Sequence, residues 1–208
     1  MMIGEFNYIR NFKVGFENQC IRLFADAYHQ SITDKTVKLD WNENDITGQL
    51  HEYIDNNPLR LEWSISTNVE QHLPNKSVKK VKGFANKDLR IDLRFVKFRK
   101  RILQTNQEYT VFFETKNLKE KGCKLKKRYI NTGIDDFIKK KYPYGFLVGY
   151  LLEGAVTPTV KGINALLKKD NREKESLEPK KHEIVQYYFE SNHAELCLKH
   201  LIFNFTML

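Results

Sequence analysis

The strongest pattern of apolar and polar positions along the chain lies in residues 109–118. Apolar side chains occupy adjacent positions there, as at Phe112 and Phe113, which predicts a strand that is buried on both faces. Glu114 and Lys116 follow near the end of this strand. Side chains two positions apart in a strand point to the same face, so the carboxylate and the ammonium are expected to stand together.

A second strand is predicted upstream, over residues 89–95, and it carries Asp92 in its middle. If the two strands pair as a hairpin, Asp92 approaches Glu114. Two carboxylates and a lysine at one point suit Mg²⁺-dependent cleavage of a phosphodiester bond. The plainer interpretation is two ordinary strands with polar residues on a solvated face. The chain indeed has a second Glu-x-Lys, at Glu178 and Lys180, in a polar segment.

The other apolar periodicities predict helices and strands around this centre. Helical spacing is found over residues 14–29, from Asn42 or Asn44 to Pro58, and over 130–142 and 156–169; strand patterns are found over 59–65, 146–152, 184–189 and 196–203. The segment at 146–152 follows a strand and a helix, and it is apolar on both faces. Strand, helix and strand in this order predict a crossover, and hence an α/β fold with a mixed β-sheet flanked by helices.

Several further segments resemble parts of one enzyme superfamily. These segments are Trp41 to Thr47, Tyr129 with Gly133, Ile134, Phe137 and Tyr142, Val148 to Tyr150, Ser191 with His193, and His200 to Phe203. Together with an Asp on one strand and Glu-x-Lys on the next, they make roughly residues 40–205 similar to the PD-(D/E)XK nucleases, which include restriction enzymes and Holliday-junction resolvases. Ile91 stands where the signature of the superfamily has a proline.

The resemblance implies a restriction-endonuclease-like core in residues 41–208, preceded by a helical extension in residues 1–40. It also implies that Asp92 and Glu114 bind Mg²⁺, for which Mn²⁺ can substitute. Lys116 would complete the catalytic set beside these two metal ligands.

An acid on the first core helix often adds to the metal site in this superfamily. The match over residues 41–47 points to Glu43 as this catalytic and metal-binding acid, and Glu52 is a competitor further along the helix. An acid in the first turn of a helix is also favoured by the helix dipole alone. Both interpretations of Glu43 therefore stay open.

The chain has 208 residues and a formal net charge of +9, a surplus that favours nucleic acid as a partner. Two basic clusters are the expected phosphate contacts: Lys97, Arg99, Lys100 and Arg101 at a hairpin tip, and Lys124, Lys126, Lys127 and Arg128 after the Glu-x-Lys strand. A solvated turn is the alternative interpretation of the first cluster. With 14 Phe and 10 Tyr, the chain is expected to bury the core of a single domain.

The three cysteines are far apart in the sequence and lack the spacing of a zinc site, which favours a reducing compartment such as the cytoplasm. No segment approaches the ~20 apolar residues of a membrane helix, so no membrane partner is expected. The predicted protein is a metal-dependent endonuclease that hydrolyses phosphodiester bonds, with DNA as the expected substrate. It would work as a homodimer or with a partner protein of an antiphage defence or restriction system. The alternative is a catalytically inactive protein of the same fold that binds nucleic acid or a partner protein.

Overall fold

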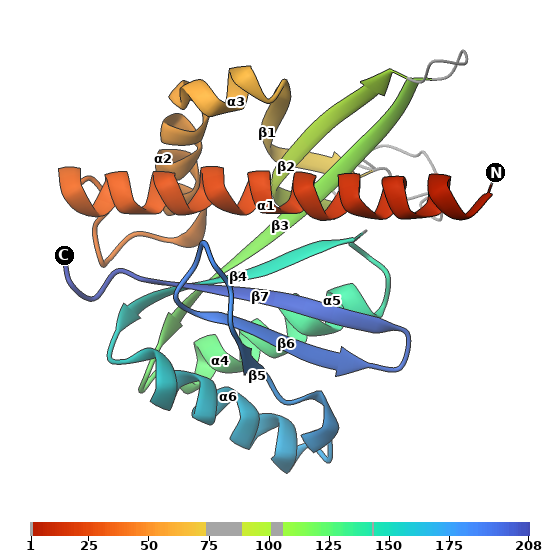
Figure 1. Cartoon of the computed structure of the whole chain (residues 1–208). Helices are drawn as coiled ribbons and strands as arrows, with labels where there is room; N and C mark the ends of the chain where they lie inside the picture. The colour runs from red at the N-terminus through yellow and green to blue at the C-terminus, as the bar shows by residue number, and fades with distance from the viewer. Residues whose placement is uncertain (1, 74–88, 101–105, 143) are drawn as a thin grey trace, which may run out of the picture.

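The computed structural model describes residues 2–73, 89–100, 106–142 and 144–208 (Figure 1). The helices are α1 (Met2–Asp34), α2 (Glu43–Asn56), α3 (Pro58–Glu62), α4 (Cys123–Tyr129), α5 (Asp135–Ile138) and α6 (Val156–Lys169). The strands are β1 (Ile65–Leu73), β2 (Leu89–Lys100), β3 (Asn106–Lys119), β4 (Gly145–Glu153), β5 (Glu178–Lys180), β6 (Tyr188–His193) and β7 (Leu196–Asn204). A π-helical turn, η2 (Ile130–Ile134), joins α4 to α5, and a 3-10 turn, η3 (Glu173–Glu175), precedes β5.

The strands form one mixed sheet, which in the described part of the chain has seven strands in the order β1-β2-β3-β4-β7-β6-β5. Strands β1, β2 and β3 form an antiparallel meander. Strand β4 is parallel to both β3 and β7, and β6 and β5 continue the sheet with antiparallel pairs. The helical segment from α4 to α5 connects β3 to the parallel β4, as such a connection requires. The predicted mixed sheet with a crossover is therefore confirmed.

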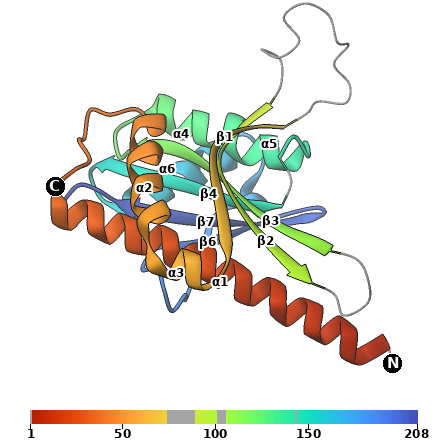
Figure 2. The ribbon, with the colours of Figure 1, turned by 90° about the horizontal axis from the view of Figure 1, so that it is seen from above.

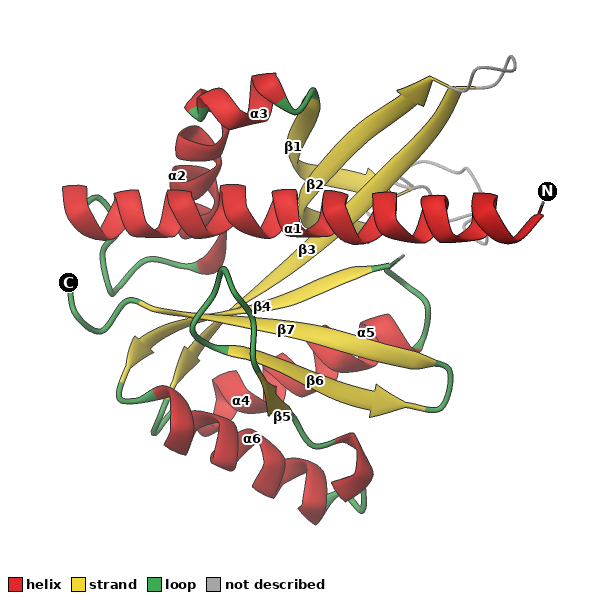
Figure 3. Ribbon diagram, viewed as in Figure 1, coloured by secondary structure: helices red, strands yellow, loops and turns green. Residues whose placement is uncertain are grey.

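Helices cover both faces of the sheet (Figures 2 and 3). One apolar layer lies between the sheet and helices α1 and α2, and it includes Phe24, Phe95, Phe113, Phe146 and Phe203. A second apolar layer lies between the sheet and helices α4 to α6, and it includes Leu118, Tyr129, Phe137, Leu147 and Ile163. Strand β4 is buried along both faces because it lies between the two layers.

Helix α1 is longer than the 14–29 segment predicted from the sequence. Its buried side chains Phe16, Cys20, Phe24 and Ala27 recur at helical spacing and belong to the same apolar layer as the sheet. The N-terminal end of α1 projects beyond β3 in Figure 1. The predicted N-terminal extension thus packs directly on the core.

The strand predicted over residues 59–65 is wrong, because most of this segment forms helix α3. Pro58 occupies its first turn, and the Asn57 side chain accepts a hydrogen bond from the Leu59 N–H at 3.0 Å. Leu59 and Trp63 both pack against the α1 side of the core. Their separation of four residues satisfies a helical period as well as the alternation of a strand, so the local pattern was ambiguous.

Two other predicted elements have different ends. The helix predicted over residues 130–142 begins at Cys123 and reaches Ile138, so all four residues of the second basic cluster are helical. The strand predicted over 184–189 begins only at Tyr188 and runs to His193. The strands at 146–152 and 196–203 and the helix over 156–169 are confirmed.

Gly145 and Gly48 give a matched pair of expected results on packing. A Cβ atom added at Gly145 would lie 2.1 Å from the carbonyl oxygen of Phe112, whereas one added at Gly48 would meet nothing within 4 Å. We expect Gly145→Ala to lower the free energy of unfolding by about 2 kcal/mol, because β4 must move away from β3. Gly48→Ala, within α2, should raise it by about 1 kcal/mol. Urea unfolding measures both changes. Equal free energies of unfolding for the two variants would contradict the close approach of β3 and β4.

Candidate active site where strands β2 and β3 part

Strands β2 and β3 separate before β2 reaches its N-terminal end. Their ladder runs from the Lys100–Asn106 pair to the Leu93–Phe113 pair. Beyond that pair β2 stays bonded to β1, while β3 continues along β4. We call the gap between the two strands the fork, and the residues that line it are Asp92, Glu114, Thr115 and Lys116.

Asp92 reaches across the fork to β3. Its Oδ2 atom accepts hydrogen bonds from the backbone N–H and from the hydroxyl of Thr115, each at 2.7 Å. The first bond occupies a backbone donor of β3 beyond the end of its ladder with β2. The predicted approach of Asp92 to the Glu-x-Lys strand is therefore present.

Glu114 and Lys116 form an ion pair on one face of β3, as the alternation predicted. Their side chains are only 5% and 6% exposed. The Lys116 ammonium also donates to the carbonyl oxygen of Thr115 at 3.0 Å. Two oxygens from adjacent residues thus converge on one buried cation.

The second carboxylate oxygen of Glu114, Oε2, is buried and accepts no hydrogen bond of good geometry among the described residues, while the Tyr142 hydroxyl lies close enough to interact with this carboxylate. The pKa of Glu114 is raised to about 8, first by burial and then by the nearby Asp92 carboxylate, against the lowering effect of Lys116. One ammonium therefore does not compensate the two carboxylates. Such an uncompensated buried acid is typical of a functional site.

Tyr142 also belongs to this site, although no catalytic or binding role was predicted for it. Its side chain is buried, and burial followed by the charge of Glu114 raises the pKa of its hydroxyl. The residue follows α5 at the start of the loop to β4 and packs edge-on against Phe137. A tyrosine after a helix carries no local signal of this proximity, because the two residues are 28 positions apart.

Helix α2 approaches the fork from the other face of β3. The Thr47 hydroxyl lies 3.1 Å from that of Thr115 and 3.0 Å from that of Tyr150. The N-terminus of α2 is fixed by Asn42, whose side chain accepts hydrogen bonds from the backbone N–H groups of residues 44 and 45. The amide of Asn117 donates to the Trp41 carbonyl oxygen at 2.9 Å. These bonds hold the first turn of α2 next to the end of β3.

The two candidate acids of α2 have different surroundings. Glu43 is buried, and Arg128 of α4 donates to both of its carboxylate oxygens. Glu52 is exposed and accepts a hydrogen bond from Gln49. Glu43 is thus the acid of α2 that lies against the α4 side, and its carboxylate is held by a guanidinium group.

The first basic cluster does not form a turn in the structure. Lys97, Arg99 and Lys100 belong to strand β2, and Arg101 lies outside the described residues. Lys97 turns toward α1, where it donates to the Gln19 side chain at 2.9 Å. Lys97 therefore lies within strand β2 rather than in a turn, and its contact with nucleic acid stays a prediction.

The second basic cluster lies on α4, directly after strand β3. Lys124 and Lys127 are exposed, and the guanidinium group of Arg128 is half exposed while it pairs with Glu43. Lys126 donates to the Glu120 carbonyl oxygen at 2.6 Å. Three of the four predicted cations thus remain accessible on α4, the helix that follows β3.

Within the described residues, no three His, Cys, Asp or Glu side chains are grouped closely enough to hold a metal ion. None of the helices described is long and apolar enough to span a bilayer. Comparisons of the chain with protein-family models, with curated proteins and with solved structures find no match.

Proposed function

We propose that this protein hydrolyses phosphodiester bonds of nucleic acid, with DNA as the substrate, in a reaction that depends on a divalent cation. The observation that carries the proposal is the fork, where Asp92, Glu114 and Lys116 converge and one buried carboxylate oxygen accepts no hydrogen bond of good geometry among the described residues. The antiparallel meander followed by a parallel crossover also supports a relationship to the PD-(D/E)XK nucleases.

The chemistry of the fork fits Mg²⁺. Carboxylate oxygens of Asp92 and Glu114 and the Thr115 carbonyl oxygen are hard ligands, and Mg²⁺ often binds proteins through one or two carboxylates while water and substrate oxygens complete its shell. The Oε2 atom of Glu114 is the oxygen that a cation would stabilise most, because it is buried and accepts no hydrogen bond of good geometry among the described residues. When bound, the metal would polarise the phosphate and acidify its water.

The protein groups around the fork have separate tasks in this proposal. Lys116 stabilises the negative charge that develops on the phosphate, since a buried ammonium acts strongly where water is excluded. Thr115 fixes the carboxylate of Asp92 through two hydrogen bonds. Glu43 orients the Arg128 guanidinium, which is half exposed and able to meet a phosphate of the strand.

Cleavage assays on plasmid and on single-stranded DNA test the proposed function. We expect the purified protein to cut in Mg²⁺ or Mn²⁺ and to be inactive in EDTA. Absence of cutting in every condition, together with retained binding of DNA, would instead favour the inactive nucleic-acid-binding protein. Absence of both would overturn the proposal.

The raised pKa of Glu114 predicts how metal binding changes with pH. Because its pKa in the folded protein is about 8 rather than its ordinary 4.5, its contribution to stability is full below pH 4.5 and is lost as the pH rises through 8. A metal ion needs the ionised carboxylate and so competes with this proton. We expect Mg²⁺ to raise Tm more at pH 9 than at pH 7, and Glu114→Gln to abolish this difference. Equal Mg²⁺ shifts at both pH values in the unaltered protein would contradict the prediction.

A further inference from the structure

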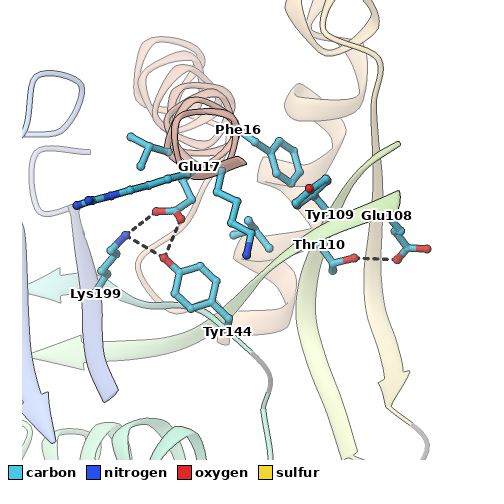
Figure 4. Close-up of a pocket in the computed structure, with 11 residues that line it drawn as sticks. Phe16, Glu17, Glu108, Tyr109, Thr110, Tyr144 and Lys199 are labelled. Carbon is cyan, nitrogen blue, oxygen red and sulfur yellow. Dashed lines mark hydrogen bonds and ion pairs between the residues drawn. The ribbon is translucent and has the colours of Figure 1, made fainter. Parts of the chain in front are cut away.

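A groove lies on the α1 side of the sheet, along the first half of β3 (Figure 4). Its volume is about 720 Å³, within the range of ligand sites of roughly 300–1,000 Å³. Helix α1 forms one wall, the first half of β3 forms another, and Tyr144 and Lys199 close it. We call it the α1 groove.

Lysine side chains and aromatic rings meet repeatedly in and beside the α1 groove. Lys13 lies 6.0 Å from the ring centre of Tyr109, and Lys199 lies 5.6 Å from that of Tyr144. Lys97, on the neighbouring strand, lies 5.9 Å from the ring of Phe12. Alternation of cations with aromatic faces is the arrangement by which proteins bind single-stranded nucleic acid, since rings stack on bases and cations meet phosphates.

The acids of the groove are already compensated. Glu17 accepts from the Lys199 ammonium with one carboxylate oxygen and from the Tyr144 hydroxyl with the other, as Figure 4 shows. Glu108 pairs with Arg94 and also accepts from Thr110 at 2.8 Å. The inner wall is therefore satisfied and close to neutral.

The two cations on the rim of the groove, unlike these acids, are not paired with an oppositely charged side chain among the described residues. Arg10 and Lys13 are exposed, and within the described part of the chain neither forms an ion pair with a carboxylate. Arg10 and Lys13 are three residues apart on α1, so their side chains lie on the same side of the helix. The groove thus combines two rim cations that have no acidic partner among the described residues with the half-exposed ring of Tyr144.

We propose that the α1 groove binds a nucleotide unit of single-stranded nucleic acid, with a base against the Tyr144 ring and its phosphate at Arg10 and Lys13. Tyr109 and Lys116 are seven residues apart on β3, or about 23 Å at the usual rise of a strand. The groove also lies on the α1 side of the sheet, whereas Glu114 and Lys116 face the α4 side, so it is a second site, separate from the fork. Binding of nucleic acid in the α1 groove is a function beyond the proposed cleavage, and it does not depend on that cleavage.

Binding of a fluorescent oligothymidylate of about 12 nucleotides, measured by anisotropy in EDTA, tests this site. We expect the pair Arg10→Gln and Lys13→Gln to weaken binding at least fivefold and to reduce the slope of log K against log salt by about 1.4. The pair Lys161→Gln and Lys169→Gln removes the same charge from exposed positions of α6 that have no acidic partner among the described residues, and it serves as the matched control, with binding expected within twofold of the unaltered protein.

Tyr144 separates stacking from charge. Tyr144→Leu is expected to weaken binding at least fivefold, whereas Tyr144→Phe keeps the ring and should bind as the unaltered protein does. Unchanged binding in Tyr144→Leu and in the Arg10 and Lys13 pair would overturn the proposal, as would an equal loss in the α6 control. Thymidine monophosphate that competes as tightly as the strand would identify a free nucleotide and overturn the assignment to single strands. Since these assays contain no metal and measure no cleavage, their result is independent of the proposed nuclease activity.

Discussion

Replacing Lys116 with methionine is expected to slow metal-dependent cleavage by a factor of about 10² to 10³, the usual loss when one preorganised charge is removed from a reacting phosphate or carbonyl group. Methionine has a similar length but no charge, so the packing beside Glu114 is largely kept. Glu114→Gln should reduce cleavage at least as much, because it removes a carboxylate ligand. Single-turnover rates at saturating protein measure both losses, and circular dichroism checks that the variants are folded.

The chain contains its own control for this experiment. Glu178 and Lys180 of β5 have the same spacing and also form an ion pair, at 3.0 Å, but their side chains are 60% and 45% exposed. We expect Glu178→Gln with Lys180→Met to cleave within twofold of the unaltered rate, because exposed pairs contribute little. Full activity in Lys116→Met would exclude the fork as the catalytic centre, and so would an equal loss in the β5 variant.

The largest effect on stability is expected at Phe113. The ring is fully buried, stacks on Phe146 at 5.0 Å between centroids, and meets Phe24 and Phe95 edge-on at 5.2 and 5.1 Å. Phe113→Ala removes these contacts and leaves a cavity, which typically costs about 3 to 5 kcal/mol. Urea unfolding followed by tryptophan fluorescence measures the change in the free energy of unfolding.

Leu61→Ala is the comparison for Phe113→Ala, since Leu61 is 69% exposed on α3. Its stability should stay within about 0.5 kcal/mol of that of the unaltered protein. A loss below about 1 kcal/mol in Phe113→Ala would mean that the aromatic cluster does not hold the sheet to α1.

The sequence predicted those elements in which a long apolar pattern had only one interpretation. Strand β3 and the crossover to β4 belong to this group, and so does the shared face of Glu114 and Lys116. The segment over 59–65 failed because its apolar spacing also fits a helix. The capping bond of Asn57 favours the helix, and an apolar pattern does not encode it.

Other features of the site depend on pairs that are distant in the chain. Glu43 and Arg128 are 85 residues apart, and no local pattern links them. Lys97 was predicted at a hairpin tip, as a phosphate contact or as part of a solvated turn, yet α1 supplies it with Gln19 and the ring of Phe12. Such contacts follow from the tertiary arrangement of α1 and α4 rather than from propensity.

Strand β3 presents Glu114 and Lys116 to the α4 side of the sheet, together with Phe112, and it presents Tyr109 and Phe113 to the α1 side. A slip of the strand by one residue would exchange these faces. Glu114 and Lys116 would then enter the layer now filled by Phe95 and Phe113, where partners for buried charges are scarce among the described residues. The two charges therefore discriminate against out-of-register pairing during folding, and they do so whether or not a substrate is ever bound.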